Sequence, residues 1–541
     1  MATTKPILPT LSFLLFISIT VASCQLAPAS SDDSTEASFV QCLISKSNPS
    51  HPISQSIYTP NDGASYSAVL QAYIRNLRFN TSSTPKPFLI LTALHVSHVQ
   101  SAVLCARTHG LQMKIRSGGH DYEGLSYVSS DSPFFILDMF NFRAVDVDIE
   151  TDTAWIQTGA ILGEVYYRIA EKSKIHAYPA GICPTVGVGG HVSGGGYGNM
   201  MRKFGLTVDH VADAVLVDVE GRLLDRKSMG EDLFWAIRGG GAASFGVVIA
   251  YKVNLVRVPE LVTSFSVFRT LEQNATDVVD KWQHVADKLD DDLFIRITLT
   301  VVNASGGGTG RTVRARFLGF FIGDSARLLS IMKSDLPELG LAQSDCVETS
   351  WINSVLFWSD LAISTPTEIL LNRTPSLTRL KRKSDYVKKP IPRDGLESLW
   401  KKMIELQLPG LVFNPYGGRM AEIAADATPF PHRAGNLWKI QYLANWNEGG
   451  DEVARRNVEL TRRLYEFMTP FVSKDPREAF LNYRDIELGV NHNGKGSYEE
   501  ARRSYGVKYF KQNFNRLVRI KTKVDPGNFF RNEQSIPVSP H

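Results

Sequence analysis

The fold of this chain is indicated first by residues 181–198, which read Gly181-Ile-Cys-Pro-Thr-Val-Gly-Val-Gly-Gly-His-Val-Ser-Gly-Gly-Gly-Tyr-Gly198. Seven of the residues from 187 to 198 are glycines. Glycine lets the backbone approach a ligand closely and point successive N–H groups at it. A loop of this composition favours binding of a pyrophosphate, because an irregular turn, the simpler alternative, does not require so many glycines.

A second glycine-rich loop has the same character. Residues 116–124 read Arg116-Ser-Gly-Gly-His-Asp-Tyr-Glu-Gly124. Each loop carries one side chain capable of nucleophilic chemistry, His120 here and Cys183 in the other loop. Taken singly, a histidine is more often a structural group, and a cysteine more often behaves as a small buried apolar residue. Their placement in two phosphate-type loops favours a role in holding a ligand for both.

Alternating strand and helix patterns surround the two loops. Apolar runs predict strands, and apolar residues at helical spacing predict helices between them. The strands are expected at 88–91, 113–115, 134–137, 154–157, 211–219 and 247–256, and the helices at 96–110, 161–170 and 231–238. The chain has no Gly-x-Gly-x-x-Gly after a strand, no P-loop and no His-Glu-x-x-His. The Rossmann fingerprint is therefore absent, and no metal site is expected.

Residues 258–475 have a different pattern of predicted strands and helices. Longer strands are predicted at 293–302, 312–321 and 438–446, with helices at 277–289 and 453–471. An antiparallel sheet covered by helices accounts for this alternation. We therefore predict an α+β fold with a first domain at 30–257 and a second at 258–475. Residues 476–541 are rich in aromatics, and this segment is expected to pack back on the first domain.

The N-terminal segment has the pattern of a secretory signal peptide. Lys5 precedes an apolar run at 11–21, and small residues follow at 22 and 23. This arrangement is typical of a cleaved signal. The run is shorter than the ~20 apolar residues that span a membrane. We expect residues 1–25 to be removed and the mature protein to be secreted without a membrane anchor.

If the protein is secreted, its cysteines and sequons predict a disulfide and glycosylation. Cys24 lies at the cleavage boundary, and an oxidising compartment favours a disulfide among the cysteines after it. Cys42 and Cys105 lie in segments with helical patterns, so a bond between them is one option. Cys346 is then left as a free thiol. Glycosylation is expected at four sequons, which begin at Asn80, Asn274, Asn303 and Asn372.

The charge balance argues against a nucleic-acid partner. The net charge is +4 over 541 residues, whereas nucleic-acid binding requires clustered basic residues. The nearest candidate is Arg379-Leu-Lys-Arg-Lys383. We interpret this single short run as a solvated face.

Both glycine-rich loops resemble those of the berberine bridge enzyme-like family of plant flavoproteins, which belongs to the vanillyl-alcohol oxidase superfamily. The resemblance runs from about Phe39 to Pro537 and includes the closing Val524-Asp-Pro-Gly-Asn-Phe-Phe-Arg531. It implies a PCMH-type FAD-binding fold with a core at about 83–257. It also implies FAD as cofactor and a Cys42–Cys105 disulfide.

The resemblance assigns roles around the flavin. In this family the histidine of Ser-Gly-Gly-His bonds the flavin 8α-methyl group, and the cysteine of Gly-x-Cys-Pro-Thr bonds flavin C6. The matching residues are His120 and Cys183. His191 matches a histidine near the flavin N1/C2 edge, and Val186 matches a position where valine accompanies access of O2. Further contacts to FAD are expected from the residues around His120, namely Ser117, Gly118, Gly119 and Asp121.

The strand predicted at 438–446 carries the expected substrate site. Alternation places Lys439 and Gln441 on one strand face. Spacing alone leaves open whether that face lines a pocket or meets solvent. The pair resembles the Lys-x-Gln of family members that oxidise alcohols, whose three active-site tyrosines match Tyr122, Tyr197 and Tyr483. Arg296 is a further candidate for the pocket.

The roles that the resemblance implies centre on Tyr197 as the base. A free tyrosine has a pKa of about 10, and a neighbouring ammonium favours the phenolate. Lys439 is therefore expected to lower the pKa of Tyr197. Gln441 stands where alkaloid-cyclising members carry a glutamate base, which argues against the berberine bridge reaction itself.

These residues together predict a monomeric, secreted, FAD-dependent oxidase of small-molecule alcohols. A saccharide's anomeric hydroxyl or an allylic phenylpropanoid alcohol would give a hydride to flavin N5 and a proton to Tyr197, with O2 reduced to H2O2. One alternative is an oxidase or oxidative cyclase of a prenylated phenol or alkaloid, and another is a catalytically silent, flavin-loaded storage protein. The cell wall is the expected location, with the vacuole as the alternative.

Overall fold

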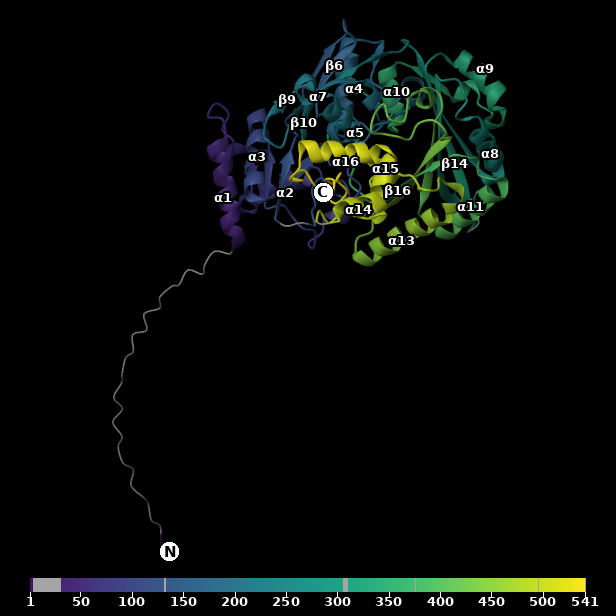
Figure 1. The fold of residues 1–541 in the computed structure, drawn as a ribbon. Coiled ribbons are helices and arrows are strands. Elements are labelled where there is room, and N and C mark those ends of the chain that lie inside the picture. Colours follow the sequence, from purple (N-terminus) through teal and green to yellow (C-terminus); the bar gives the residue numbers. More distant parts are fainter. Residues whose placement is uncertain (3–30, 131–132, 305–309, 375, 495, 541) are drawn as a thin grey trace.

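The computed structural model describes residues 1–2, 31–130, 133–304, 310–374, 376–494 and 496–540. The predicted signal peptide and its cleavage boundary lie almost entirely outside these residues. The chain forms an α+β structure with three main sheets, as the sequence predicts (Figure 1). Within the described residues, none of the helices is both long and apolar enough to span a bilayer.

The first sheet has four strands in the order β1-β2-β4-β3. Strands β2 and β3 both run parallel to β4, which lies between them, and the short β1 is antiparallel to β2. Its elements, with the helices beside it, are β1 (Ile57–Tyr58), β2 (Leu89–Thr92), β3 (Gln112–Arg116), β4 (Phe134–Asp138), α1 (Ser31–Lys46), α2 (Ala64–Gln71) and α3 (Val96–His109). A disulfide joins Cys42 in α1 to Cys105 in α3, in agreement with the predicted pairing.

The second sheet has five antiparallel strands in the order β5-β6-β10-β8-β9. Its buried face packs on α4, whose residues Leu162, Val165 and Ile169 are fully covered. The elements of this part are β5 (Val145–Asp148), β6 (Thr153–Gln157), α4 (Leu162–Lys172), β7 (His176–Ala177), α5 (Val188–Ser193), α6 (Met201–Phe204), β8 (Val211–Val217), β9 (Leu223–Leu224), α7 (Arg226–Ala236), β10 (Val247–Asn254) and β11 (Val256–Arg257).

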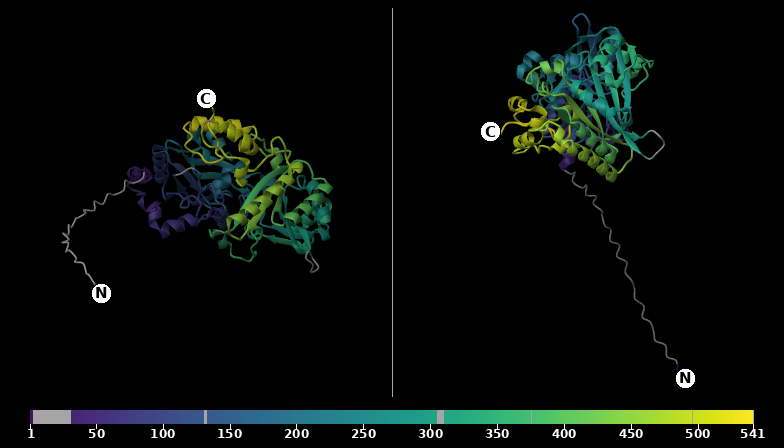
Figure 2. Two further views of the ribbon diagram at one scale, coloured as in Figure 1. Left: turned by 90° about the horizontal axis from the view of Figure 1, so that it is seen from below. Right: turned by 90° about the vertical axis from the view of Figure 1, so that its right-hand side faces the viewer.

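The third sheet has seven antiparallel strands in the order β15-β12-β14-β13-β17-β18-β16. Helices cover one of its faces, where Trp282, Met403 and Leu464 join the strand residues in one apolar cluster. Figure 2 shows the long green strands side by side with helices along them. The elements are β12 (Val262–Thr270), α8 (Ala275–Val285), β13 (Leu293–Asn303), β14 (Arg311–Phe321), α9 (Ser325–Asp335), β15 (Cys346–Thr349), α10 (Trp351–Trp358), β16 (Arg379–Val387), α11 (Arg393–Leu406), β17 (Gly410–Pro415), α12 (Arg419–Glu422), β18 (Trp438–Trp446) and α13 (Asp451–Phe467).

The C-terminal segment packs on elements of the first half of the chain. In Figure 1 the yellow α16 lies across the elements of that half. The buried Lys521 of α16 donates hydrogen bonds to the Ser244 and Phe530 carbonyls and to the Asp525 carboxylate. The helices of this segment are α14 (Ser497–Ala501), α15 (Val507–Phe510) and α16 (Asn513–Val524).

The interpretation of residues 379–383 as a solvated face is wrong. They begin the edge strand β16, and Lys381, Arg382 and Lys383 are buried. Lys381 contacts the carboxylates of Glu123 and Asp485, and Lys383 contacts Asp485 as well. Carboxylates from distant parts of the chain supply the partners that let these cations be buried, and a sequence pattern does not show such partners.

Candidate active site

The two glycine-rich loops meet at one point. A Cβ placed on Gly118 would lie 2.4 Å from the backbone nitrogen of Gly187, and a Cβ on Gly187 would lie 2.3 Å from that of Gly118. Both distances are too short for any side chain. Glycine is therefore required at this crossing, because the backbones of the two loops touch.

His120 and Cys183 line the same cavity as the two glycines of this crossing. His120 is partly buried, and its Nε2 lies 3.1 Å from Thr185 Oγ1 in the other loop. Burial, reinforced by Arg75, lowers the pKa of His120 well below its ordinary value. Cys183 carries a free thiol that faces the open cavity. The surrounding protein raises the pKa of Cys183 by burial, and nearby arginines, Arg296 foremost, oppose that rise.

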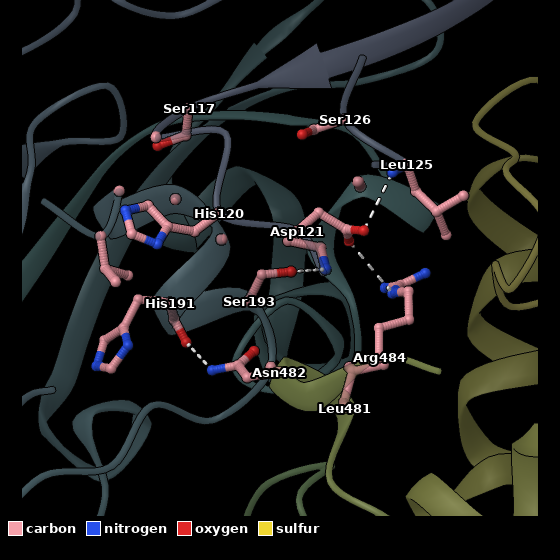
Figure 3. A pocket seen from close by; sticks show the side chains of 18 of the residues that line it. Ser117, His120, Asp121, Leu125, Ser126, His191, Ser193, Leu481, Asn482 and Arg484 are labelled. Carbon is pink, nitrogen blue, oxygen red and sulfur yellow. Dashed lines mark hydrogen bonds and ion pairs between the residues drawn. The ribbon is translucent and has the colours of Figure 1, made fainter. Parts of the chain in front are cut away.

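The loops enclose a cavity of about 350 Å³. Figure 3 shows His120 and Asp121 projecting from one loop, with Asn482 and Arg484 on the C-terminal segment across from them. The expected cofactor residues that line this cavity are Ser117, Gly118, Gly119, His120, Asp121, Cys183, Val186 and His191. Among the described residues, no group of three or more histidines, cysteines or carboxylates is arranged to hold a metal ion.

Several of these residues fix the loops themselves. Ser117 Oγ donates a hydrogen bond to the Thr158 carbonyl at 2.6 Å. One oxygen of Asp121 accepts hydrogen bonds from the N–H groups of Glu123 and Leu125. The loop that carries His120 is thus held in place from within. Val186 is half-buried in the cavity wall.

His191 joins three segments of chain. Its Nε2 accepts a hydrogen bond from the Gly181 N–H and lies 3.0 Å from Thr207 Oγ1. Asn482 of the C-terminal segment donates a hydrogen bond to the His191 carbonyl. Burial lowers the pKa of His191 to about 3, and Lys439 adds to that shift. A neutral imidazole is therefore built into this wall of the cavity.

One polar residue of β18, Gln441, reaches the same cavity. Gln441 lines it, and its Nε2 donates a hydrogen bond to the Tyr122 hydroxyl at 2.9 Å. Tyr197 and Tyr483 are also in the lining, and their hydroxyls share a short hydrogen bond. The structure thus places two hydroxyl-bearing pairs in the cavity. Of the 438–446 face that the spacing left undecided, Gln441 lines the cavity, whereas Lys439 is buried beneath aromatic rings.

Lys439 contacts Tyr197 in an unexpected way. Its Nζ lies over the ring, 3.2 Å from the centroid, and also 3.8 Å from the Phe480 centroid. Burial lowers the pKa of Lys439 well below its ordinary value, and Arg296 adds to the effect. Burial also raises the pKa of Tyr197, and Arg296 is the cation that opposes this most. The expectation that Lys439 lowers the pKa of Tyr197 is therefore not met in this structure.

Arg296 has a larger role than the sequence indicated. It comes from β13 and lines the cavity. Its Nε donates a hydrogen bond to Asn414 Oδ1 at 2.7 Å, and its guanidinium lies 5.4 Å from the Trp358 ring centroid. Asn414 and Trp358 were not predicted as site residues. Asn414 lies in β17 beside β13, so only strand pairing brings it to Arg296.

The C-terminal segment supplies cavity residues that the sequence analysis missed. Phe480, Asn482 and Arg484 all line the cavity around Tyr483. Arg484 Nε lies 3.9 Å from the Asp121 carboxylate. The family match of Tyr483 was the signal in the sequence that pointed toward this region.

A two-loop cradle, a free thiol and tyrosine pairs in one cavity fit an FAD-binding oxidoreductase. Residues 87–226, which contain both loops in full, match the family described as FAD binding domain. Residues 479–537 match the family described as berberine and berberine like.

The chain belongs to the berberine bridge enzyme-like family. It is 64% identical over 515 residues to berberine bridge enzyme-like 8 of Arabidopsis thaliana, covering 95% of this chain and 97% of that protein. It is 54% identical to berberine bridge enzyme-like 21 of the same plant, covering 97% of each chain.

Solved structures have the same fold. Berberine bridge enzyme-like 28 from Arabidopsis thaliana superposes with a TM-score of 0.86 at 45% identity, over 93% of this chain and 99% of that one. Phl p 4, a grass pollen allergen with glucose dehydrogenase activity, gives 0.87 at 42% identity, over 93% and 100%. A variant of berberine bridge enzyme gives 0.86 at 36% identity, over 93% and 100%.

Proposed function

We propose that this protein is an FAD-dependent oxidase of alcohol groups that reduces O2 to H2O2. The substrate class is a saccharide with an anomeric hydroxyl or an allylic phenylpropanoid alcohol. The observation that carries the proposal is the pairing of Tyr197 with Tyr483 and of Gln441 with Tyr122 in the cavity that contains Cys183.

The residues of the cavity fit FAD. Gly118 and Gly187 line the cavity without side chains, which suits the close approach of a pyrophosphate. In this proposal His120 bonds the flavin at 8α and Cys183 bonds it at C6. Ser117, Asp121 and His191 hold the loops that carry these anchors. A doubly attached flavin stays in place while the site remains open to large substrates.

The side chains on the substrate side have separate roles. When bound, the isoalloxazine ring supplies the hydride acceptor at N5. The Tyr197 oxygen takes the proton of the substrate hydroxyl, and Tyr483 holds the Tyr197 oxygen in place. Gln441 and Tyr122 orient the hydroxyl. Arg296 supplies the charge that favours a Tyr197 phenolate.

Val186 supports O2 as the electron acceptor. It lies in the cavity wall three residues after Cys183. Wild-type Phl p 4 is described as a glucose dehydrogenase, and a variant of it with one isoleucine replaced by valine is described as a glucose oxidase. Val186→Ile is expected to slow reoxidation of the reduced enzyme by O2, measured by stopped-flow absorbance, and to leave anaerobic reduction by substrate unchanged.

A second candidate function is the oxidation or oxidative cyclisation of a prenylated phenol or alkaloid. Its support is the likeness to berberine bridge enzyme at 36% identity over the whole of that chain. It would use the same flavin with a different fit of substrate. Gln441, which has no ionisable proton, favours the alcohol oxidase.

A substrate panel with peroxide readout separates the two functions. Cello-oligosaccharides, oligogalacturonides, coniferyl alcohol and prenylated phenols would be tested at equal concentration. Peroxide release with a saccharide or coniferyl alcohol supports the first function. Turnover confined to the prenylated phenols would replace it with the second.

The proposal includes secretion and glycosylation. The Cys42–Cys105 disulfide is typical of an oxidising compartment. All four sequon asparagines, Asn80, Asn274, Asn303 and Asn372, are exposed, so that burial does not exclude a glycan at any of them. We also propose a monomer with domains at 30–257 and 258–475 and a C-terminal segment at 476–541. The cell wall is the proposed location.

A further inference from the structure

One buried arginine contacts both glycine-rich loops. Arg75 lies after α2 and is only 5% exposed. Its Nε donates a hydrogen bond to the Gly118 carbonyl at 2.8 Å, and its second guanidinium nitrogen donates to the Thr185 carbonyl at 3.4 Å. A single side chain therefore ties together two segments that are far apart in sequence.

These two carbonyls lie next to the proposed flavin anchors. Gly118 precedes His120 by two residues, and Thr185 follows Cys183 by two residues. The Arg75 guanidinium thus sets how far apart the two anchor residues stand. The next residue, Asn76, also holds the His120 loop, because its side chain donates a hydrogen bond to the Tyr122 carbonyl at 2.9 Å.

The guanidinium of Arg75 has different partners from that of Arg116. Arg116 is paired with the Asp138 carboxylate and also donates to two carbonyls of α2. Arg75 makes its described hydrogen bonds to carbonyls alone. Burial lowers the pKa of Arg75 to about 10, so the guanidinium stays charged at neutral pH. An uncompensated positive charge is therefore held beside both anchors.

A positive charge helps both proposed nucleophiles. A histidine attacks as the neutral imidazole, and a cysteine attacks as the thiolate. Arg75 contributes to the lowered pKa of His120, and it opposes the burial that raises the pKa of Cys183. The same cation thus favours the reactive form of each residue.

We propose that Arg75 is a positioning residue for covalent flavin attachment, which holds the His120 and Cys183 loops at one spacing and keeps both nucleophiles reactive. The inference rests on the doubly attached flavin of the proposed function. Arg75 acts through the two anchors and needs no contact with the flavin.

Atoms and electrons balance in each attachment step. A C–N bond forms to the 8α carbon as that carbon and the His120 imidazole each lose one hydrogen. A C–S bond forms to C6 as that carbon and the Cys183 thiol each lose one hydrogen. In both steps the flavin ring takes up two electrons and two protons, and O2 removes them as H2O2.

The test compares full-length Arg75→Met, Arg75→Lys and wild-type protein from a secretory host. Flavin retained after acid precipitation is measured by absorbance, and the peptides that contain His120 and Cys183 are weighed by mass spectrometry. Wild type should carry both bonds. Arg75→Met should lose at least ~10-fold in doubly attached flavin, and Arg75→Lys should lie between the two because it keeps the charge but loses the forked geometry.

Control measurements distinguish a loss of flavin attachment from a loss of folding. Arg107→Met removes an exposed arginine that pairs with Glu220, and it should keep the wild-type fraction of attached flavin. Folding of each variant is checked by the circular dichroism spectrum. If Arg75→Met does not fold, Arg75→Lys decides, and full double attachment in it would overturn the proposal. Double attachment at the wild-type level in folded Arg75→Met would also overturn it, whereas wild type without covalent flavin would reject the proposed function itself.

Discussion

Tyr197 is the residue on which the proposed proton transfer depends. Its hydroxyl is hydrogen-bonded to Tyr483, and its ring is covered by Lys439. Tyr197→Phe removes the hydroxyl and leaves the ring contact. We expect flavin reduction under anaerobic conditions to slow by about 10²–10⁴-fold, as measured by stopped-flow absorbance. Gln407→Asn, at the end of α11 and outside the residues that line the cavity, is the polar control. A Tyr197→Phe rate equal to that of wild type would reject the base assignment.

The pH dependence follows from the charges around Tyr197. Burial raises the pKa of Tyr197 above its ordinary value, and Arg296 opposes that rise. A base works in its deprotonated form, so the rate of flavin reduction should rise with pH through the neutral and alkaline range. Arg296→Met removes the cation, which should move the rising limb to higher pH. A rate that stays flat between about pH 6 and 9 in wild type would contradict this account.

Cys183 and His120 could be predicted as site residues from the sequence, whereas Asn414 and Trp358 could not. Their residue types and loop context were visible in the sequence, and the family resemblance assigned their bonds. Asn414 and Trp358 carried no such signal, because an asparagine in a strand and a tryptophan in a helix are ordinary. Their contacts with Arg296 exist only after the third sheet has formed.

At the scale of elements, the crossing of the two loops is sensitive to any added side chain. A Cβ on Gly187 would lie 2.2 Å from Ser117 Oγ and 2.3 Å from the Gly118 nitrogen. Because one of these neighbours is backbone, the loops must separate to make room. Gly187→Ala should therefore reduce flavin content by at least ~10-fold by destroying the close approach, as measured by the ratio of flavin to protein absorbance.

Gly527→Ala is the matched control for this prediction. An added Cβ there has no neighbour within 4 Å, and Gly527 is not among the glycines with positive φ. Its flavin content should equal that of wild type. A Gly187→Ala protein with full flavin content would show that the crossing tolerates separation.

The secondary structure around the loops was predicted well, but the ends of elements shifted. The helix predicted at 453–471 runs from Asp451 to Phe467 as α13. The helix predicted at 231–238 corresponds to the second part of α7, Arg226–Ala236, which follows a break at the non-helical Gly230. Helix ends depend on caps, such as the Asp225 side chain that accepts the Ser228 N–H at the start of α7. Apolar periodicity does not record these caps.

At the scale of the whole molecule, a buried ionic cluster joins three parts of the chain. Lys381 of β16 contacts Glu123 from the His120 loop and Asp485 from the C-terminal segment. Glu123 directly follows Tyr122, and Asp485 follows Tyr483 by two residues. The cluster thus ties the chain segments of Tyr122 and Tyr483 to the third sheet.

Glu123 makes the stability of the protein depend on pH. Burial raises the pKa of Glu123 to about 7, against the opposing effect of Lys381. A carboxyl with a raised folded-state pKa contributes stability that is present below its unfolded pKa of about 4.3 and is lost as pH rises through the folded pKa. Glu123→Gln should therefore lessen, by roughly 1–3 kcal/mol, the fall in unfolding free energy between about pH 4.5 and 7.5.

Denaturant unfolding at both pH values measures this difference. Glu405→Gln alters an exposed carboxylate that pairs with Lys402 and should leave the pH dependence as in wild type. The same fall in Glu123→Gln as in wild type would mean that Glu123 is ionised throughout.

The sequence by itself determined the α+β class, the family, the two glycine-rich loops and the residue types of the site. These are local properties, because glycine content and apolar spacing are read directly along the chain. Only the tertiary structure decided that the basic run of β16 is buried, that Arg75 joins the two loops and that Arg296 rather than Lys439 acts on the pKa of Tyr197. Burial and electrostatic interaction depend on distances between residues far apart in sequence, and folding alone sets those distances.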